Sequence, residues 1–226
     1  LTKILPKCLC CGSTLLVDCV DLGRQVPCNW LREPGSEPLQ TFPLETRVCS
    51  FCSHMQLREA VDPTTLFSNY TYRTGVSFTL CQHYKDLAES AINFHRLANY
   101  SNSHWKRNDL VVMDIGCNDC TLLSYFGQNG LKTVGVDPCE VSDHQPVDMF
   151  VESPWNEDVM GRLMNQKVRP DIITATNVLA HNSYPQNFLS MCNMALHNDG
   201  IIVIEFPYAK DMMKNCEFDT IYHEHV

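Results

Sequence analysis

The sequence lacks the features of several protein classes. It has no run of about 18 apolar residues, which excludes a membrane-spanning helix of ordinary composition. Residues 1–7 lack the apolar core of a signal peptide, so we expect a cytoplasmic protein with no membrane partner. Lysine and arginine total only 17 against 26 aspartates and glutamates, and they form no cluster that would neutralise a phosphate backbone. The net charge of -9 therefore argues against a nucleic-acid partner.

Cysteine, in contrast, is abundant. The thirteen cysteines are an odd number in a chain without a secretory signal, so they indicate reduced thiols and metal ligands rather than a disulfide framework. Cys8-x-x-Cys11 and Cys49-x-x-Cys52 have the spacing that places two thiolates at two corners of a tetrahedron around Zn²⁺. Four thiolates leave no open position, which predicts a structural zinc site. Rival ligands are Cys10, Cys19, Cys28 and His54, and the alternative is that several of these cysteines are simply buried small apolar residues.

A second pattern lies in the middle of the chain. Residues 110–113 form a continuous apolar run, typical of a parallel strand, and Gly116 then permits a tight turn. Asp137 ends the next strand, close to the spacing of about 20 residues at which an acid meets ribose hydroxyls. A dinucleotide site would favour a third glycine, whereas Asp114 and Asn118 suit a zwitterionic amino-acid tail. The pattern predicts an S-adenosylmethionine site, although a glycine after a strand is often only a turn.

The alternation of elements predicts the fold class. We expect an α/β fold with a doubly wound, mostly parallel, Rossmann-like sheet, preceded by a small zinc-binding module. The expected strands lie near 110–115, 132–136, 147–151, 171–175 and 200–206, and the expected helices near 84–98, 119–128, 156–166 and 185–197. The expected domains are a zinc-binding module at 1–60, an aromatic connector and helix at 61–105, and a cofactor domain at 106–226.

Proton-handling side chains gather near residue 226. Tyr222, His223, Glu224 and His225 are consecutive. In an extended segment the two histidines would share one face, whereas in a turn all four side chains could converge. Two alternatives stay open: polar surface residues near a terminus, or a metal site, although the zincin spacing His-Glu-x-x-His is absent.

The ordered motifs resemble one family, the nucleotide-sugar C-methyltransferases of deoxysugar pathways. Besides both cysteine pairs, the motifs are Tyr70 to Gly75, Asp114 to Asp119, Gly135 to Pro138, Asn177 to His181, Glu205 to Tyr208 and Tyr222 to His225. The resemblance implies a class I methyltransferase that uses S-adenosylmethionine to methylate a ring carbon of a thymidine-diphosphate-linked 4-keto-deoxysugar.

The resemblance also exposes two departures from the family. Family members continue well past Val226 into a carboxyl-terminal domain, so we expect a truncated chain or a protein that has lost this domain. The family pattern has glycine where Cys120 stands, and a side chain there could crowd the cofactor. The pair Cys117-x-x-Cys120 has metal-like spacing, but it sits in the cofactor turn, where a redox or metal role would compete with ligand binding.

By resemblance, residue roles can be assigned. His225 is the expected base and Glu224 supports it, while Tyr222, Tyr72 and His181 are candidate donors to an enolate oxygen. The predicted cofactor residues are Asp114, Gly116, Asn118, Asp137 and Asn177. Structural alternatives are a packed aromatic at Tyr72, a helix-pinning His181 and a turn-forming Asn177. Rival functions are a catalytically silent binding protein and a methyltransferase that acts on a small keto acid or a hydroxyl group.

Overall fold

A computed structural model describes residues 2–67, 72–99, 109–139 and 144–226. The chain divides into two compact units. The amino-terminal unit comprises Leu1–Tyr72, Ala180–Gln186 and Phe206–Val226, and the sheet unit comprises Arg73–Leu179 and Asn187–Glu205. The expected domain boundaries at 60 and 105 stay a prediction. The second of those boundaries, and Tyr70 and Thr71 of the aromatic motif, lie outside the described residues.

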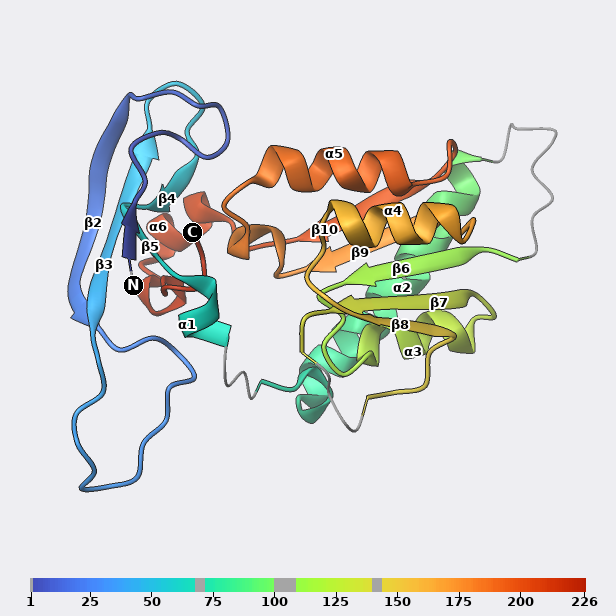
Figure 1. Cartoon of the computed structure of the whole chain (residues 1–226), viewed down its shortest axis with the longest axis horizontal. Helices are drawn as coiled ribbons and strands as arrows, with labels where there is room; N and C mark the ends of the chain where they lie inside the picture. The colour runs from blue at the N-terminus through green and yellow to red at the C-terminus, as the bar shows by residue number, and fades with distance from the viewer. Residues whose placement is uncertain (1, 68–71, 100–108, 140–143) are drawn as a thin grey trace. The chain divides into compact units, whose positions relative to one another are not determined.

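The sheet unit is built on five parallel strands in the order β10-β9-β6-β7-β8 (Figure 1). Their bounds are β6 Val111–Ile115, β7 Lys132–Asp137, β8 Met149–Glu152, β9 Ile172–Thr176 and β10 Ile201–Glu205. The chain therefore begins at the centre with β6, proceeds outward to β8, and then returns to the other side of β6. This reversal of strand order confirms the predicted doubly wound fold.

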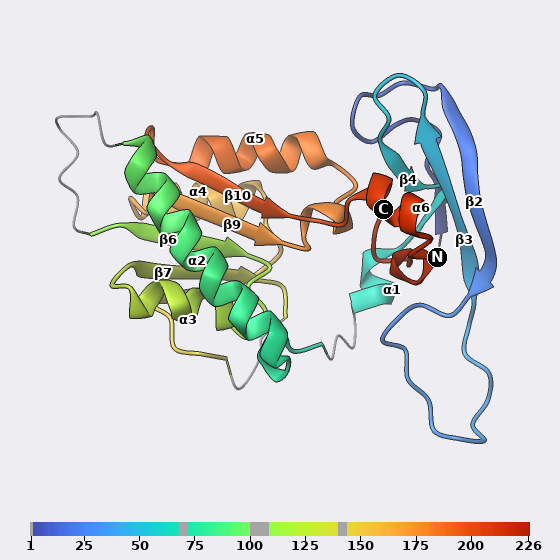
Figure 2. The same ribbon diagram turned by 180° about the vertical axis from the view of Figure 1, so that it is seen from behind.

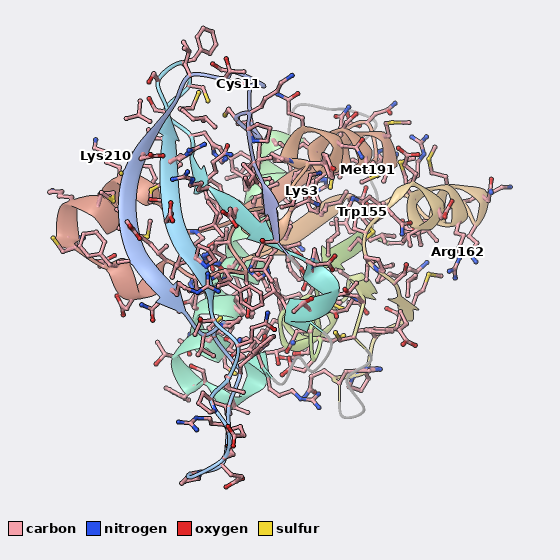
Figure 3. All side chains as sticks on the ribbon, turned by 60° about the vertical axis from the view of Figure 1, so that its left-hand side comes forward. Lys3, Cys11, Trp155, Arg162, Met191 and Lys210 are labelled. Atoms are coloured by element: carbon pink, nitrogen blue, oxygen red, sulfur yellow. The ribbon has the colours of Figure 1, made fainter. Side chains whose placement is uncertain are left out.

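Helices cover both faces of this sheet (Figure 2). One face packs against α2 (Phe78–Ala98) and α3 (Thr121–Gln128), which contribute buried Ile92 and Phe126. The other face packs against α4 (Glu157–Asn165) and α5 (Pro185–Ala195). Among the residues buried there are Trp155 and Met191, which Figure 3 labels. Because both faces are covered, consecutive buried apolar residues such as Val112 and Met113 of β6 and Ile172 and Ile173 of β9 replace the alternation of a one-sided sheet.

Local chemistry sets where the helices begin. The hydroxyl of Ser77 accepts a hydrogen bond from the N–H of Leu80 at 3.3 Å, so α2 begins six residues before the expected Tyr84. The side chain of Asn156 caps α4 in the same way. Helix α3 begins at Thr121 rather than at Asp119, because Cys120 adopts left-handed backbone with φ of 60°.

The amino-terminal unit is built from short antiparallel sheets. Strands β2 (Leu16–Gln25), β3 (Phe42–Cys49) and β4 (Met55–Leu57) form one sheet in that order, and β1 (Thr2–Ile4) pairs with β5 (Glu59–Val61). Along β3, buried side chains alternate with half-buried ones from Phe42 onward, which is the period of a strand that covers a core.

Helical segments complete this unit. They are α1 (Pro63–Phe67), α6 (Ala209–Asn215) and the short 3-10 turn Phe218–Thr220; two further 3-10 turns are Thr74–Val76 and Leu179–His181. Ile221 packs with Leu44 and Leu57 of the three-stranded sheet, so the last residues of the chain are part of the core of the amino-terminal unit. None of the helices that the structure describes is long and apolar enough to cross a membrane.

Two glycine substitutions test the packing of the sheet unit. A Cβ added at Gly135 of β7 would lie 2.8 Å from Sγ of Cys117 and 3.2 Å from the ring of Phe150, whereas one added at Gly161 of α4 meets open space. We expect Gly135→Ala to lower the free energy of unfolding by about 1–3 kcal/mol through overpacking. Gly161→Ala should raise it by about 0.5–1 kcal/mol. Urea unfolding followed by circular dichroism measures both, and equal effects of the two substitutions would contradict the packing described.

Candidate functional site

Four thiols converge in the amino-terminal unit. The Sγ atoms of Cys8, Cys11, Cys49 and Cys52 all lie within 4.8 Å of one another. Cys8 and Cys52 are 3.6 Å apart, as are Cys11 and Cys49, while Zn–S bonds of about 2.3 Å give a tetrahedral edge of about 3.8 Å. Figure 3 shows Cys11 at the tip of the three-stranded sheet. The thiols therefore fit a closed, structural zinc ion.

The four thiols do not share one pKa. A hydrogen bond from the backbone of Cys52 lowers the pKa of the Cys49 thiol to about 6, whereas the pKa values of Cys11 and Cys52 are raised, against backbone hydrogen bonds, by burial and neighbouring thiols. Cys49 therefore most readily forms the thiolate that zinc requires. The rival ligands lie elsewhere: Cys10 and Cys19 are exposed, and Cys28 is engaged by a carboxylate described below. Among the described residues, only the four predicted cysteines group in a geometry that could hold a metal ion.

The second candidate site is the rim formed by the carboxyl ends of the parallel strands. In a doubly wound sheet, ligands bind at this edge where the strand order reverses, which here is between β6 and β9. The loops that follow these two strands touch there. Gly116 has a φ of 70°, and a Cβ on it would lie 2.3 Å from a methyl group of Val178. Glycine is therefore required at this turn by both backbone conformation and space.

Asp137 and Asn118 meet at the rim. The N–H of Asn118 donates to Oδ2 of Asp137 at 2.8 Å, and the N–H of Cys139 donates to Oδ1 at the same distance. Burial raises the pKa of Asp137, against these two hydrogen bonds. The carboxylate is thus held in a fixed orientation at the end of β7, as a group that receives ribose hydroxyls must be.

Asp114 occupies a more enclosed position. Its Oδ1 accepts a hydrogen bond of 2.6 Å from the hydroxyl of Thr174, on the neighbouring strand β9. Burial raises the pKa of Asp114 to about 7, with the Thr174 hydrogen bond opposing it. Asn177 follows β9 with a φ of 55°, and its N–H donates to the carbonyl of Glu205. Non-glycine residues in left-handed backbone store strain, and such strain concentrates at functional loops.

The structure also locates the departure from the family pattern. Cys120 is fully buried, and its Sγ lies 3.7 Å from that of Cys117 in the core beneath α2 and α3. The hydrogen bond between the two thiols, together with burial, raises the pKa of Cys117. Both thiols therefore pack as small apolar groups.

Several rim residues have no signal in the sequence pattern alone. The N–H of Thr74 donates to Oδ1 of Asn118, and the N–H of Gly75 donates to a carboxylate oxygen of Asp119 at 2.7 Å. The end of the aromatic motif thus contacts the cofactor turn. At the last residue of β10, Glu205 lies 2.5 Å from Nε2 of His83 on α2. For Gly75 and Glu205, the only sequence signal that pointed to a site at the rim was that both belong to the ordered family motifs.

Three of the predicted catalytic residues come together in the amino-terminal unit. The ring of His225 lies 4.0 Å from that of Tyr222 and 5.0 Å from that of His181, measured between centroids. Burial lowers the pKa of His225 to about 4, and burial with the neighbouring His225 lowers the pKa of His181 to about 4. Nε2 of His225 is buried without a hydrogen-bond partner among the described residues. A neutral imidazole with a free acceptor atom can take up a proton.

The turn at residues 222–225 sends the other side chains elsewhere. The N–H of His225 donates to the carbonyl of Tyr222, and His223 faces the carbonyl of Phe42 at 3.2 Å. The hydrogen-bond partners that the structure gives Glu224 are Cys28 and Asn29 rather than His225. The four consecutive residues therefore neither alternate as in a strand nor converge on one point.

Tyr72 and Tyr222 differ in their surroundings. Tyr72 is 43% exposed, so it is not a packed core aromatic. Burial, with smaller contributions from Cys28, Glu224 and Tyr72, raises the pKa of Tyr222 to about 12. Tyr222 thus stays protonated at neutral pH and can act as a hydrogen-bond donor.

A hollow of about 570 Å³ lies at the opposite, amino edge of the sheet unit. Its charged lining residues include Lys132, Asp148, Lys167 and Arg169. None of the predicted site residues lines it. The rim is therefore identified by the strand ends and their hydrogen bonds, not by this hollow.

Two family models match successive parts of the chain. Residues 8–67 match the family model described as "Putative zinc binding domain". Residues 82–226 match the family model described as "Methyltransferase domain".

Individual relatives are more distant. The chain is 28% identical over 233 residues to the C-methyltransferase NovU of Streptomyces niveus, an alignment that covers 100% of this chain and 53% of NovU. The chain thus spans about half the length of this curated relative. The plantazolicin methyltransferase BpumL, solved with SAH, is 16% identical over 62% of this chain and 54% of its own, with a TM-score of 0.46. CalS10, an amino pentose methyltransferase from Micromonospora echinaspora solved with SAM, is 12% identical over 63% and 60%, with a TM-score of 0.45.

Zinc content tests the thiol cluster. We expect the purified protein to carry about one zinc ion per chain and Cys49→Ser to lose it, with a lower melting temperature, because three thiols cannot close the tetrahedron. Cys19→Ser, which changes an exposed thiol of the same unit, is the matched control and should keep the metal. Elemental analysis measures the ratio. Retention of zinc by Cys49→Ser would mean that a different ligand set holds it.

Proposed function

Because the chain belongs to the methyltransferase-domain family, whose model matches residues 82–226, we propose that it is an S-adenosylmethionine-dependent C-methyltransferase. We further propose that the acceptor is a thymidine-diphosphate-linked 4-keto-deoxysugar, methylated at a ring carbon beside the ketone. The observation that carries the proposal is the group formed by His181, Tyr222 and His225, because methylation at carbon requires removal of a C–H proton. The similarity to NovU, a C-methyltransferase, supports the same chemistry.

The rim residues have the donor set that the cofactor needs. The oriented carboxylate of Asp137 suits the ribose hydroxyls, while Asn118, Asp114 and Asn177 lie at the strand ends where a polar amino-acid tail is bound. Gly116 lets the backbone turn closely beside the ligand. When bound, S-adenosylmethionine supplies an electrophilic methyl group for direct displacement, which requires alignment more than acid or base assistance.

Proton removal is assigned to His225. Its Nε2, which is buried and has no hydrogen-bond partner among the described residues, takes the proton from the carbon beside the ketone and leaves an enolate. The enolate carbon forms the new C–C bond. Tyr222 and His181, whose rings flank His225, are candidates for hydrogen bonds to the enolate oxygen, as is Tyr72, one of the exposed tyrosines of the same unit.

A catalytically silent binding protein is the alternative function. The side chain at Cys120 was one of the features of the sequence that favoured it, because a thiol in place of glycine could block the cofactor. The thiol of Cys120 packs in the core against Cys117 instead, which weakens that argument. Cofactor binding and proton exchange distinguish the two functions directly.

Cofactor binding is tested at Asp137. We expect calorimetric titration with S-adenosylmethionine to show binding, and Asp137→Asn to weaken it about 10- to 100-fold, since a hydrogen bond to a charged group contributes about 1.5–3 kcal/mol. The matched control is Asp148→Asn, which changes a carboxylate that bonds Thr133 at the amino end of β7. If the unaltered protein gives no heat of binding, the silent binding protein is favoured. If both variants lose the same affinity, Asp137 has no specific role in binding the cofactor.

Proton removal is tested by deuterium exchange. We expect the protein to exchange the proton beside the ketone of the nucleotide sugar with solvent, and His225→Asn to abolish that exchange. Because burial lowers the pKa of His225 to about 4, the imidazole stays neutral as pH falls through 6.5, so exchange should persist at about pH 5.5. NMR of the recovered sugar in D₂O measures the rate.

Two results would count against this assignment. Exchange that survives in His225→Asn would move the base elsewhere. A loss of exchange centred near pH 6.5 would show a base with the ordinary pKa of histidine, in conflict with the burial of His225. Gln82→Asn, a change on the exposed face of α2, serves as the neutral control.

A further inference from the structure

The carboxyl group of Glu224 is held from a distant part of the chain. Its side chain is 4% exposed, and one oxygen, Oε1, accepts hydrogen bonds from Sγ of Cys28 at 3.0 Å and from Nδ2 of Asn29 at 3.2 Å. Both donors lie in the segment between β2 and β3, almost 200 residues earlier in the sequence. All three residues belong to the amino-terminal unit.

The two donors are electrically neutral. Glu224 takes part in none of the ion pairs found among the described residues, which join Arg47, Arg58 or His83 to other carboxylates. Neutral donors orient a carboxylate without cancelling its charge. A carboxylate that only needed stabilisation in the interior would be expected to have a cationic partner.

The thiol of Cys28 can donate its hydrogen bond to Glu224 at any pH near neutrality. Burial, followed by the hydrogen bond to Glu224, raises the pKa of its thiol to about 12, so the sulfur keeps its proton at neutral pH. The zinc-type cluster is complete without it. Asn29 has a φ of 66°, a conformation that asparagine adopts more readily than most residues, and this backbone turn presents its side-chain amide to Glu224.

We propose that Cys28 and Asn29 are positioning residues, which fix the carboxylate of Glu224 as an oriented negative charge for the proton transfer. The proposal rests on the proposed function, in which Glu224 supports that step. A negative charge that is already oriented at Glu224 can stabilise the imidazolium that develops on His225, and no side chain has to reorganise during the reaction. It also explains why a residue adjacent to His225 is engaged by the β2–β3 segment and not by the imidazole.

The proposal is tested with substitutions that remove or keep a donor. Cys28→Ala removes it, and we expect the rate constant for solvent exchange to fall about 10- to 100-fold with little change in KM, the size expected for one bond to a charged acceptor. Cys28→Ser keeps a donor of similar shape and should restore most of the rate. Asn29→Gly retains the left-handed backbone but removes the amide, and should cost less. Cys19→Ala is the control in the same unit.

A spectroscopic readout reports the bond itself. In the infrared difference spectrum between the unaltered protein and Cys28→Ala, the S–H stretch of Cys28 should appear at the lowered frequency of a thiol bonded to a carboxylate, and Glu224→Gln should shift it. A merely structural role for Cys28 would not give the combined pattern of a lost rate, rescue by serine and unchanged KM. Circular dichroism and zinc content confirm that each variant folds.

The failure of this proposal is distinguishable from that of the proposed function. Full exchange in Cys28→Ala, with exchange lost in Glu224→Gln, would overturn the positioning role and leave the proposed function intact. An unshifted S–H band would also overturn the positioning role, whatever the activity. If the unaltered protein does not exchange the sugar proton at all, the proposed function fails, and the positioning role that rests on it fails with it.

Discussion

The contact between two loops at the reversal of strand order is the constraint on which the rim depends. Gly116 after β6 lies against Val178 after β9, so closely that even a methyl group at Gly116 has no room. The left-handed turn that this contact requires delivers the N–H of Asn118 to the carboxylate of Asp137 on the next strand. Asn118 and Cys120 are also left-handed, and α3 begins directly after Cys120. The orientation of the predicted ribose-binding carboxylate of Asp137 thus depends on packing at Gly116, two residues before the Asn118 that bonds it.

The sequence was sufficient to predict the elements whose structure depends on residues close together in the chain. Parallel strands such as Val111–Ile115 are apolar because both of their faces are covered, and this leaves a continuous run in the sequence. Two thiols separated by two residues reach the same metal ion within one turn of chain, so the cysteine pairs could also be identified from spacing. The start of α2 at Phe78 was missed because the cap, Ser77, lies before the apolar period begins.

Long-range pairing has no comparable sequence signal. Nothing near Glu224 indicates that Cys28 would bond it, and nothing near Ile221 indicates that it completes the core above Leu44. The behaviour of residues 222–225 also depended on one backbone hydrogen bond: as a strand, His223 and His225 would have shared a face, but the turn closed by the N–H of His225 separates them. Residue types and order indicated the proposed chemistry, whereas the partners of each group required the three-dimensional structure.

The burial of His225 has two opposing effects on the proposed reaction. It keeps the imidazole neutral, so the acceptor atom is available, but a pKa of about 4 also makes it a weaker base than an exposed histidine, by a few kcal/mol of proton affinity. Removing a proton from carbon creates an enolate, whose negative charge would favour the new imidazolium and raise its pKa. The base therefore becomes stronger as the charge develops. Stabilisation that is absent in the free protein and present in the transition state is the kind that accelerates a reaction.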